Sequence, residues 1–123
     1  MSRVASGTRL PFRTLDGSTV TELVHPVRDP AVAQSLAQAV VAPGESTRLH
    51  RHHETEEIYY LQEGHGEMRL GAETFEVAAG DSVVIAPGTP HNIRNVGTSP
   101  LVFLCCCAPG YEHADTVLEN VDD

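Results

Sequence analysis

Short runs of alternating apolar and polar residues, separated by turn residues, make up most of this chain. Met68 and Leu70 alternate with polar neighbours, and Phe75 and Val77 do the same beyond Gly71. Alternation with a period of two predicts strands that have one dry and one wet face. The short glycine-containing gap between these two segments predicts a tight hairpin.

Longer apolar runs add further strands to this pattern. Ser82–Ala86 and Leu101–Cys107 are nearly continuous apolar runs, which are typical of strands covered on both faces. The alanine-rich segment 31–41 could pass for a helix, but we favour a strand over Ser35–Ala42, because a proline and a glycine end the run. Since turn residues recur at short intervals and no segment has a clear helical period, the pattern predicts an all-β sandwich or barrel.

The organisation of the 123 residues is that of one domain. Residues 1–33 contain three prolines and are expected to form an N-terminal arm with one strand near Val20–Val24. Residues 34–108 are expected to form the barrel core. Residues 109–123 form a polar, acidic tail. No linker or internal repeat indicates a second domain.

The net charge of the chain limits the classes of partner that it is expected to bind. The chain has 17 acidic and 8 basic residues, which gives a net charge of −9. Nucleic acids and anionic membrane surfaces require a basic surface, so we expect neither as a partner. The first residues lack the apolar core of a signal peptide, and the longest apolar run is less than half of the roughly 20 residues that a transmembrane helix needs. We therefore expect a cytoplasmic protein with no membrane partner.

A group of histidines and glutamates offers candidate metal ligands. His50 and His52 are two residues apart, so on a strand both would project from the same face. Glu57 follows at an odd separation and can join them only if the polar residues in between form a turn or bulge. A shift of one residue would make Glu56 the ligand instead. His91, after the turn sequence APGTPH, is the best candidate for a fourth ligand.

The spacing of these residues alone leaves two interpretations open. One is a solvated polar turn, and the other is a site for a divalent metal ion with nitrogen and oxygen ligands. The other four histidines have no comparable partners and are expected at the surface; they are His25, His53, His65 and His113.

Two stretches resemble the two sequence motifs of the cupin superfamily. The first, GESTRLHRHHETEEIYYLQEG, has the order glycine, five residues, His-x-His, four residues, glutamate, six residues, glycine. The second, GDSVVIAPGTPHNIRN, departs from the motif at Ala86, where a proline is usual. The matching positions are Gly44, His50, His52, Glu57 and Gly64 in the first motif, and Gly80, Gly88, His91 and Asn95 in the second.

The resemblance implies a double-stranded β-helix, the jelly-roll barrel of the cupins, whose two sheets enclose a ligand-sized interior. It implies that His50, His52, Glu57 and His91 hold one divalent ion, with Fe, Mn, Ni, Zn or Cu as candidates. Four protein ligands on an octahedral ion would leave two positions for water, oxygen or substrate. The family is commonly dimeric, so we expect a homodimer with a small-molecule ligand in each barrel.

Three functions are compatible with such a site. An enzyme with dioxygenase chemistry, an oxidoreductase, is slightly favoured. A second possibility is a non-oxidative isomerase or lyase, in which Tyr59, on the same strand face as Glu57 and lowered in pKa near the metal, removes a proton. The third is a protein that binds a metal or small molecule without catalysis. Tyr59 could also be an aromatic residue of the barrel wall, with no chemical role.

Three consecutive cysteines lie in the last apolar run. Cys105 and Cys107 share one strand face and Cys106 takes the other, so at most some of them face the interior. The favoured interpretation is packing in the core, because buried cysteine behaves as a small hydrophobic residue. The alternative is a thiol that lies beside the metal or binds it.

Overall fold

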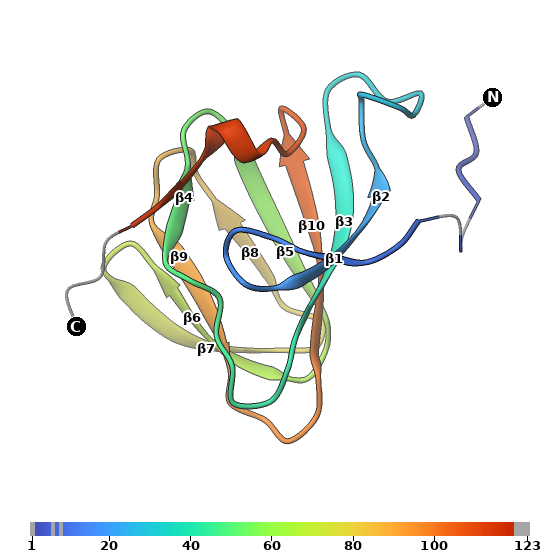
Figure 1. Cartoon of the computed structure of the whole chain (residues 1–123). Helices are drawn as coiled ribbons and strands as arrows, with labels where there is room; N and C mark the ends of the chain where they lie inside the picture. Colours follow the sequence, from blue (N-terminus) through green and yellow to red (C-terminus); the bar gives the residue numbers. More distant parts are fainter. Residues whose placement is uncertain (1, 6, 8, 120–123) are drawn as a thin grey trace.

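The computed structural model describes residues 2–5, 7 and 9–119 as two antiparallel sheets that face each other (Figure 1). One sheet has six strands in the order β1 (Phe12–Arg13), β2 (Thr19–Val24), β3 (Ser35–Val41), β10 (Leu101–Ala108), β5 (Glu56–Glu63) and β8 (Ser82–Ile85). The other has five strands in the order β11 (Thr116–Leu118), β4 (His50–His52), β9 (His91–Asn95), β6 (His65–Leu70) and β7 (Glu73–Ala78). This is the all-β double-stranded β-helix that the sequence predicted.

The predicted strands are present near their expected positions. Each of the six segments lies on one strand, and the segment predicted over Ser35–Ala42 is strand β3 rather than a helix. The hairpin around Gly71 joins β6 to β7, with Leu70 opposite Glu73. Gly71 has a φ of 59°, a conformation that glycine adopts without steric cost.

The apolar core lies between the two sheets and is built from alternate positions of the strands. Leu61 and Phe103 point inward from the six-stranded sheet, and Met68 and Ile93 point inward from the five-stranded sheet. All four are at most 1% exposed. Burial of a side chain of this size stabilises the fold by ~1.5–3 kcal/mol.

The two apolar runs are covered on one face only, so the prediction that both faces are covered is wrong. In β8, Val83 and Ile85 are buried while Val84 is 60% exposed. In β10 the inward residues are buried and the alternate ones are half-buried. The reason is that the outer face of the six-stranded sheet has no layer packed on it within the described chain.

The sheets extend beyond residues 34–108 at both ends. Strand β2 pairs with β3, and β11 pairs with β4, where Thr116 lies opposite His52. A short 3₁₀ helix, η1 (His113–Asp115), precedes β11 and is the only helix in the described part of the chain. No helix among the described residues is long and apolar enough to cross a membrane. The acidic end of the predicted tail, 120–123, lies outside the described residues.

Candidate metal centre

Three of the four predicted ligands come from adjacent strands of the five-stranded sheet. His50 and His52 both point inward from β4, while Arg51 between them is half-buried on the other face. His91 is the first residue of β9 and lies opposite His50 in the ladder. The pairing of β4 with β9 therefore brings together histidines that are about forty residues apart in the sequence.

The fourth ligand, Glu57, comes from the opposite sheet. The chain leaves the five-stranded sheet after His52 and enters the six-stranded sheet at β5, so that Glu57 points back toward the histidines. Residues 53–55 make this crossing, which confirms the predicted break in the strand. Glu57 is buried and Glu56 is exposed, so Glu57 rather than Glu56 faces the histidines.

Asp115 holds the crossing segment in place. Its carboxylate accepts backbone hydrogen bonds from Glu54 at 2.9 Å and from Thr55 at 3.1 Å, and its carbonyl accepts one from His53 at 2.8 Å. Three consecutive backbone N–H groups are thus bound to one residue near the C-terminus. These contacts fix the direction in which the chain enters β5 and therefore the position of Glu57.

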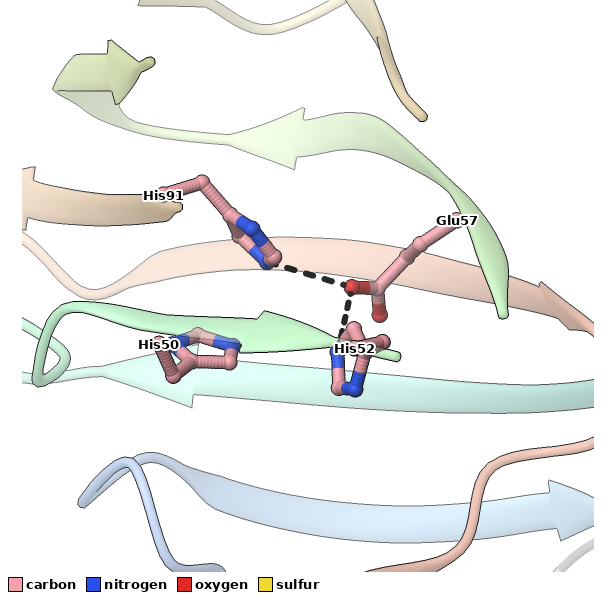
Figure 2. Close-up of side chains that lie close together, drawn as sticks. All are labelled: His50, His52, Glu57 and His91. Atoms are coloured by element: carbon pink, nitrogen blue, oxygen red, sulfur yellow. Dashed lines mark hydrogen bonds and ion pairs between the residues drawn. The ribbon is translucent and has the colours of Figure 1, made fainter. Parts of the chain in front are cut away.

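The four side chains converge on one point in the interior (Figure 2). One ligand atom from each lies within 4.8 Å of the others. Glu57 Oε1 is 3.1 Å from His52 Nε2 and 3.4 Å from His91 Nε2. Neighbouring ligands of an octahedral ion with bonds of roughly 2.1 Å are about 3.0 Å apart, so these separations are close to those of a ligand set.

Hydrogen bonds away from the centre set the orientation and tautomer of each imidazole. His50 Nδ1 donates to the Arg48 carbonyl at 2.7 Å, and His91 Nδ1 donates to the Thr89 carbonyl at 2.9 Å. The hydroxyl of Thr116 donates to the Glu112 carbonyl, so its oxygen accepts from His52 Nδ1 at 3.1 Å. In each neutral ring the proton is on Nδ1 and the Nε2 lone pair faces the centre, as in metal-binding histidines.

A bound cation would satisfy the polar atoms that meet at this point. With Nδ1 protonated, His91 Nε2 and the Glu57 carboxylate are acceptors that face each other at 3.4 Å, and His52 Nε2 lies within hydrogen-bonding distance of the same carboxylate oxygen. The Nε2 atom of His91 is completely buried and has no hydrogen-bond partner. Buried polar atoms without partners are rare in native proteins. A divalent ion would satisfy all of these acceptors at once, so the residues fit such an ion.

The pKa values reflect the same crowding of groups. Burial and the neighbouring His91 lower the pKa of His50. Burial by itself lowers the pKa of His52, but the hydrogen bond and charge of Glu57 outweigh it and raise the pKa above its ordinary value. Burial by itself raises the pKa of Glu57, but the hydrogen bond with His52 and the close contact with His91 outweigh it, so this pKa lies well below the usual range. Glu57 is therefore a carboxylate at neutral pH.

A small cavity opens next to the metal centre. Its volume is about 50 Å³, several times the roughly 10–15 Å³ that one water molecule requires. His50, His52 and Glu57 line it, together with residues of β2, β3 and β10, of the turn between β1 and β2, and of the segment after β10. The volume favours a ligand of only a few atoms.

Tyr59 lies in the wall of this cavity, as its strand position predicted. Its ring packs against Phe103, with centroids 4.6 Å apart, and lies 5.9 Å from the ring of His91. Burial, with the charge of Glu57 adding to it, raises the pKa of Tyr59 well above its usual value. The phenol is therefore protonated at neutral pH, and the direction of this pKa shift is opposite to the lowered pKa that a proton-removing role requires.

Two of the three cysteines face the interior, as the alternation predicted. Cys105 and Cys107 are buried and line the cavity, and Cys106 is half-buried on the outer face. Cys107 Sγ donates to Glu57 Oε2 at 3.3 Å, so this thiol holds the carboxylate oxygen that faces away from His52. Among the described residues, the four-residue ligand cluster contains no cysteine.

One expectation for the other histidines is wrong. His53, His65 and His113 are exposed as predicted, but His25 is buried. His25 Nε2 lies 2.7 Å from the carbonyl of Tyr111, because the segment after β10 packs against the end of β2. Proximity in space to a distant segment, which spacing does not reveal, accounts for this difference.

Sequence reasoning also missed three residues around the centre. Asp16 lines the cavity, Thr116 orients His52, and Asp115 holds the crossing segment. All three lie outside the two motifs, Asp16 in the turn between β1 and β2, Asp115 in η1 and Thr116 at the start of β11. Asp16 is followed by Gly17 and Ser18, which is typical of an ordinary turn, so no signal in the sequence singled it out.

Comparison with protein families agrees with the fold and the site. The family model described as cupin domain matches residues 37–107, which is more than half of the chain and includes all four clustered side chains. The chain therefore belongs to the cupin domain family.

Individual relatives and structures are similar over most of the chain. An uncharacterized protein from Methanocaldococcus jannaschii is 52% identical over 106 residues, covering 86% of this chain and 85% of that protein. The polyketide synthase CurC of Streptomyces cyaneus is 33% identical over 112 residues, covering 87% and 73%. The crystal structure of a predicted oxalate decarboxylase from Thermotoga maritima matches with a TM-score of 0.74 at 26% identity, covering 89% of this chain and 98% of that one.

Proposed function

We propose that this protein is a mononuclear metal-dependent enzyme that acts on a small molecule. The observation that carries the proposal is the set of three imidazoles whose Nδ1 protons are held elsewhere, so that their Nε2 lone pairs meet a buried carboxylate. His50, His52, Glu57 and His91 would be the ligands of one Fe, Mn, Ni, Zn or Cu ion. Mixed imidazole and carboxylate donors suit divalent ions of this group.

The favoured chemistry is oxidative, of the dioxygenase type. A bound ion of this kind supplies Lewis acidity and, if it is redox-active, the electron transfer that reaction with dioxygen requires. The chain's residues would orient the substrate in the cavity and exclude bulk water. Phe103 and Tyr59 would form an apolar wall, and Cys107 would keep the Glu57 carboxylate in position.

The second candidate is a non-oxidative lyase or isomerase. Two observations favour it: the fold similarity to a predicted oxalate decarboxylase, and the position of Tyr59 in the cavity wall. Because its pKa is raised, Tyr59 keeps its proton at neutral pH, so in that reaction it would be a weak acid that gives a proton to the substrate rather than the base that removes one. If Tyr59→Phe retained full turnover on an active substrate, a proton-transfer role for this phenol would be ruled out.

Elemental analysis of the purified protein tests the metal site directly. We expect about one divalent ion per chain, and loss of most of it in His50→Ala and in His91→Ala. The exposed His53 is the matched control, because His53→Ala removes an imidazole next to the site without touching it. A full metal complement in both site variants would contradict the assignment.

Oxygen uptake by the iron-loaded protein with small phenolic and dicarbonyl substrates then separates oxidative from non-oxidative chemistry.

A homodimer is part of the same proposal. The outer face of the six-stranded sheet exposes apolar side chains from neighbouring strands: Ile58 and Tyr60 on β5 and Val84 on β8. Exposed apolar patches of this kind mark protein interfaces. Light scattering should give twice the chain mass, and Tyr60→Glu should shift the protein toward the monomer. A monomeric wild-type protein at micromolar concentration would contradict the proposal.

A further inference from the structure

Asp16 is held rigidly at the tip of the turn between β1 and β2. Its Oδ1 atom accepts hydrogen bonds from the Thr14 hydroxyl, from the Ser18 hydroxyl at 2.7 Å and from the Ser18 backbone N–H at 2.9 Å. Its carbonyl accepts a further bond from the Arg48 N–H at 2.7 Å, which ties the turn to the segment that leads into β4. These bonds fix the carboxylate and occupy only one of its two oxygens.

The other oxygen of Asp16 points at the metal centre. Oδ2 is 3.6 Å from His50 Nε2, and both atoms belong to residues of the cavity wall. His50 Nδ1 donates to the Arg48 carbonyl, so in the neutral ring Nε2 is an acceptor. Two acceptors therefore face each other across the cavity. Asp16 is not one of the four clustered side chains, and its free oxygen lies in the cavity wall, where it can contact a group bound beside the ion.

The described residues that line the cavity include the carboxylates of Asp16, Glu22 and Glu57 but no arginine. All 8 basic residues of the chain other than histidine are arginines, and none of them is among the described residues that line the cavity. Glu22 also lines the cavity, but its carboxylate pairs with Arg28 at 2.9 Å. Asp16 is thus a fixed negative charge at the open side of the metal centre. Because the cavity has no arginine, a dicarboxylate would find no cation there except the ion itself.

We propose that Asp16 is a specificity-determining residue that selects a ligand with a hydroxyl group beside its metal-binding oxygen. The Oδ2 atom accepts the hydrogen bond of that hydroxyl, as in a hydroxyketone or an enol, while its charge repels a dianion such as oxalate. This inference rests on the proposed metal-dependent function and adds the class of ligand to it.

The test compares two ligands of similar size on the cobalt(II)-loaded protein. Hydroxyacetone is a neutral hydroxyketone and oxalate is a dianion, and the visible absorption of cobalt(II) reports binding of either without turnover. In Asp16→Asn the amide keeps the turn's hydrogen bonds and removes the charge. We expect this variant to bind oxalate roughly tenfold more tightly, because like charges at such short distances interact strongly, and to bind hydroxyacetone several-fold more weakly.

Two further variants make the result interpretable. Glu22→Gln is the matched control, since it removes the same charge from the same cavity wall at a carboxylate that is already paired; both affinities should stay within about twofold. Asp16→Ser, in which a small polar residue caps the turn, gives a second measurement of the same preference in case the asparagine variant folds poorly.

The outcomes separate this inference from the proposed function. If Asp16→Asn and Asp16→Ser bind cobalt(II) with the wild-type ratio of oxalate to hydroxyacetone affinity, the selecting role of Asp16 is wrong and the metal centre stands. Loss of both affinities in parallel would assign Asp16 a purely structural role and would also overturn the inference. A wild-type protein that binds no cobalt(II) would contradict both.

Discussion

Each imidazole of the metal centre is positioned by an atom that the ion itself would not touch. His52 shows this most clearly, because its Nδ1 acceptor is a side chain, the hydroxyl of Thr116, rather than a backbone carbonyl. This hydroxyl is itself oriented by the carbonyl of Glu112. A substitution at Thr116 can therefore remove the orienting contact without changing any ligand.

We expect Thr116→Val to lower the affinity for a divalent metal by roughly tenfold, because partners of metal-binding histidines contribute that much to affinity. Thr116→Ser keeps the hydroxyl and should keep most of the affinity. Competition with a coloured chelator measures both variants. Equal affinity in the valine variant and the wild type would show that the ring of His52 is held by packing alone.

The affinity for a divalent metal should also increase with pH. Protons and the ion compete for the same Nε2 atoms, and Glu57 raises the pKa of His52, so a proton is retained there above the ordinary pKa of histidine, ~6.5. Affinity should rise as the pH increases through that raised pKa and then level off. Below it, affinity should fall by about tenfold per pH unit for each proton displaced. Chelator competition from pH 5.5 to 8.5 tests this, and an affinity that is constant over that range would contradict it.

At the scale of elements, the crossing between the two sheets decides where Glu57 lies. Asp115→Ala would leave the backbone N–H groups of Glu54 and Thr55 without their carboxylate acceptor. We expect it to lower the free energy of unfolding by ~1–3 kcal/mol and to weaken metal binding as well. Asp115→Asn, which keeps one carbonyl oxygen, should lie between the alanine variant and the wild type. Urea unfolding gives the first quantity, and an unchanged midpoint and slope in the alanine variant would contradict this role.

The sequence predicted some elements well and others poorly for identifiable reasons. Strands with regular alternation, such as β6 and β7, could be found because one of their faces is buried in the core. Strands β1 and β11 are two and three residues long, too short for any pattern. Strand β1 forms as the partner of β2 in a local hairpin, and β11 forms because the distant strand β4 offers it an edge.

The residues of the candidate site could likewise be predicted only in part. The spacing of His50 and His52 directly predicted that both side chains project from the same face of a strand. The odd separation of Glu57 from His52 indicated a break in that strand. That the break carries the chain into the opposite sheet depends on the pairing of β5 with β8 and β10, which the spacing does not contain. Asp16 could not be predicted at all, because its position depends on the docking of the β1–β2 turn against Arg48.

At the scale of the whole molecule, an ion in this centre would join the two sheets. Its ligands come from β4 and β9 on one side and β5 on the other. An ion that binds only the folded state at 100 times its dissociation constant adds about 2.7 kcal/mol to the free energy of unfolding. For a domain of this size that corresponds to roughly 10 °C in melting temperature.

Thermal denaturation with and without the metal measures this stabilisation. His91→Ala is the control, because it removes a ligand while leaving both sheets in place. The variant should show little shift on addition of the metal. A shift as large as that of the wild type would mean that the stabilising ion binds elsewhere on this acidic chain.

The central part of the chain and its two ends contribute different residues to the site, and this has a consequence for how such proteins diversify. All four clustered side chains lie within residues 37–107, whereas Asp16 and Thr116 lie before and after this range. The segments that carry Asp16 and Thr116 therefore contribute to the site from outside the range that the family model matches. A relative with different terminal segments would keep the four clustered side chains and could still bind a different ligand. Comparison of the shared central region alone would not reveal that difference.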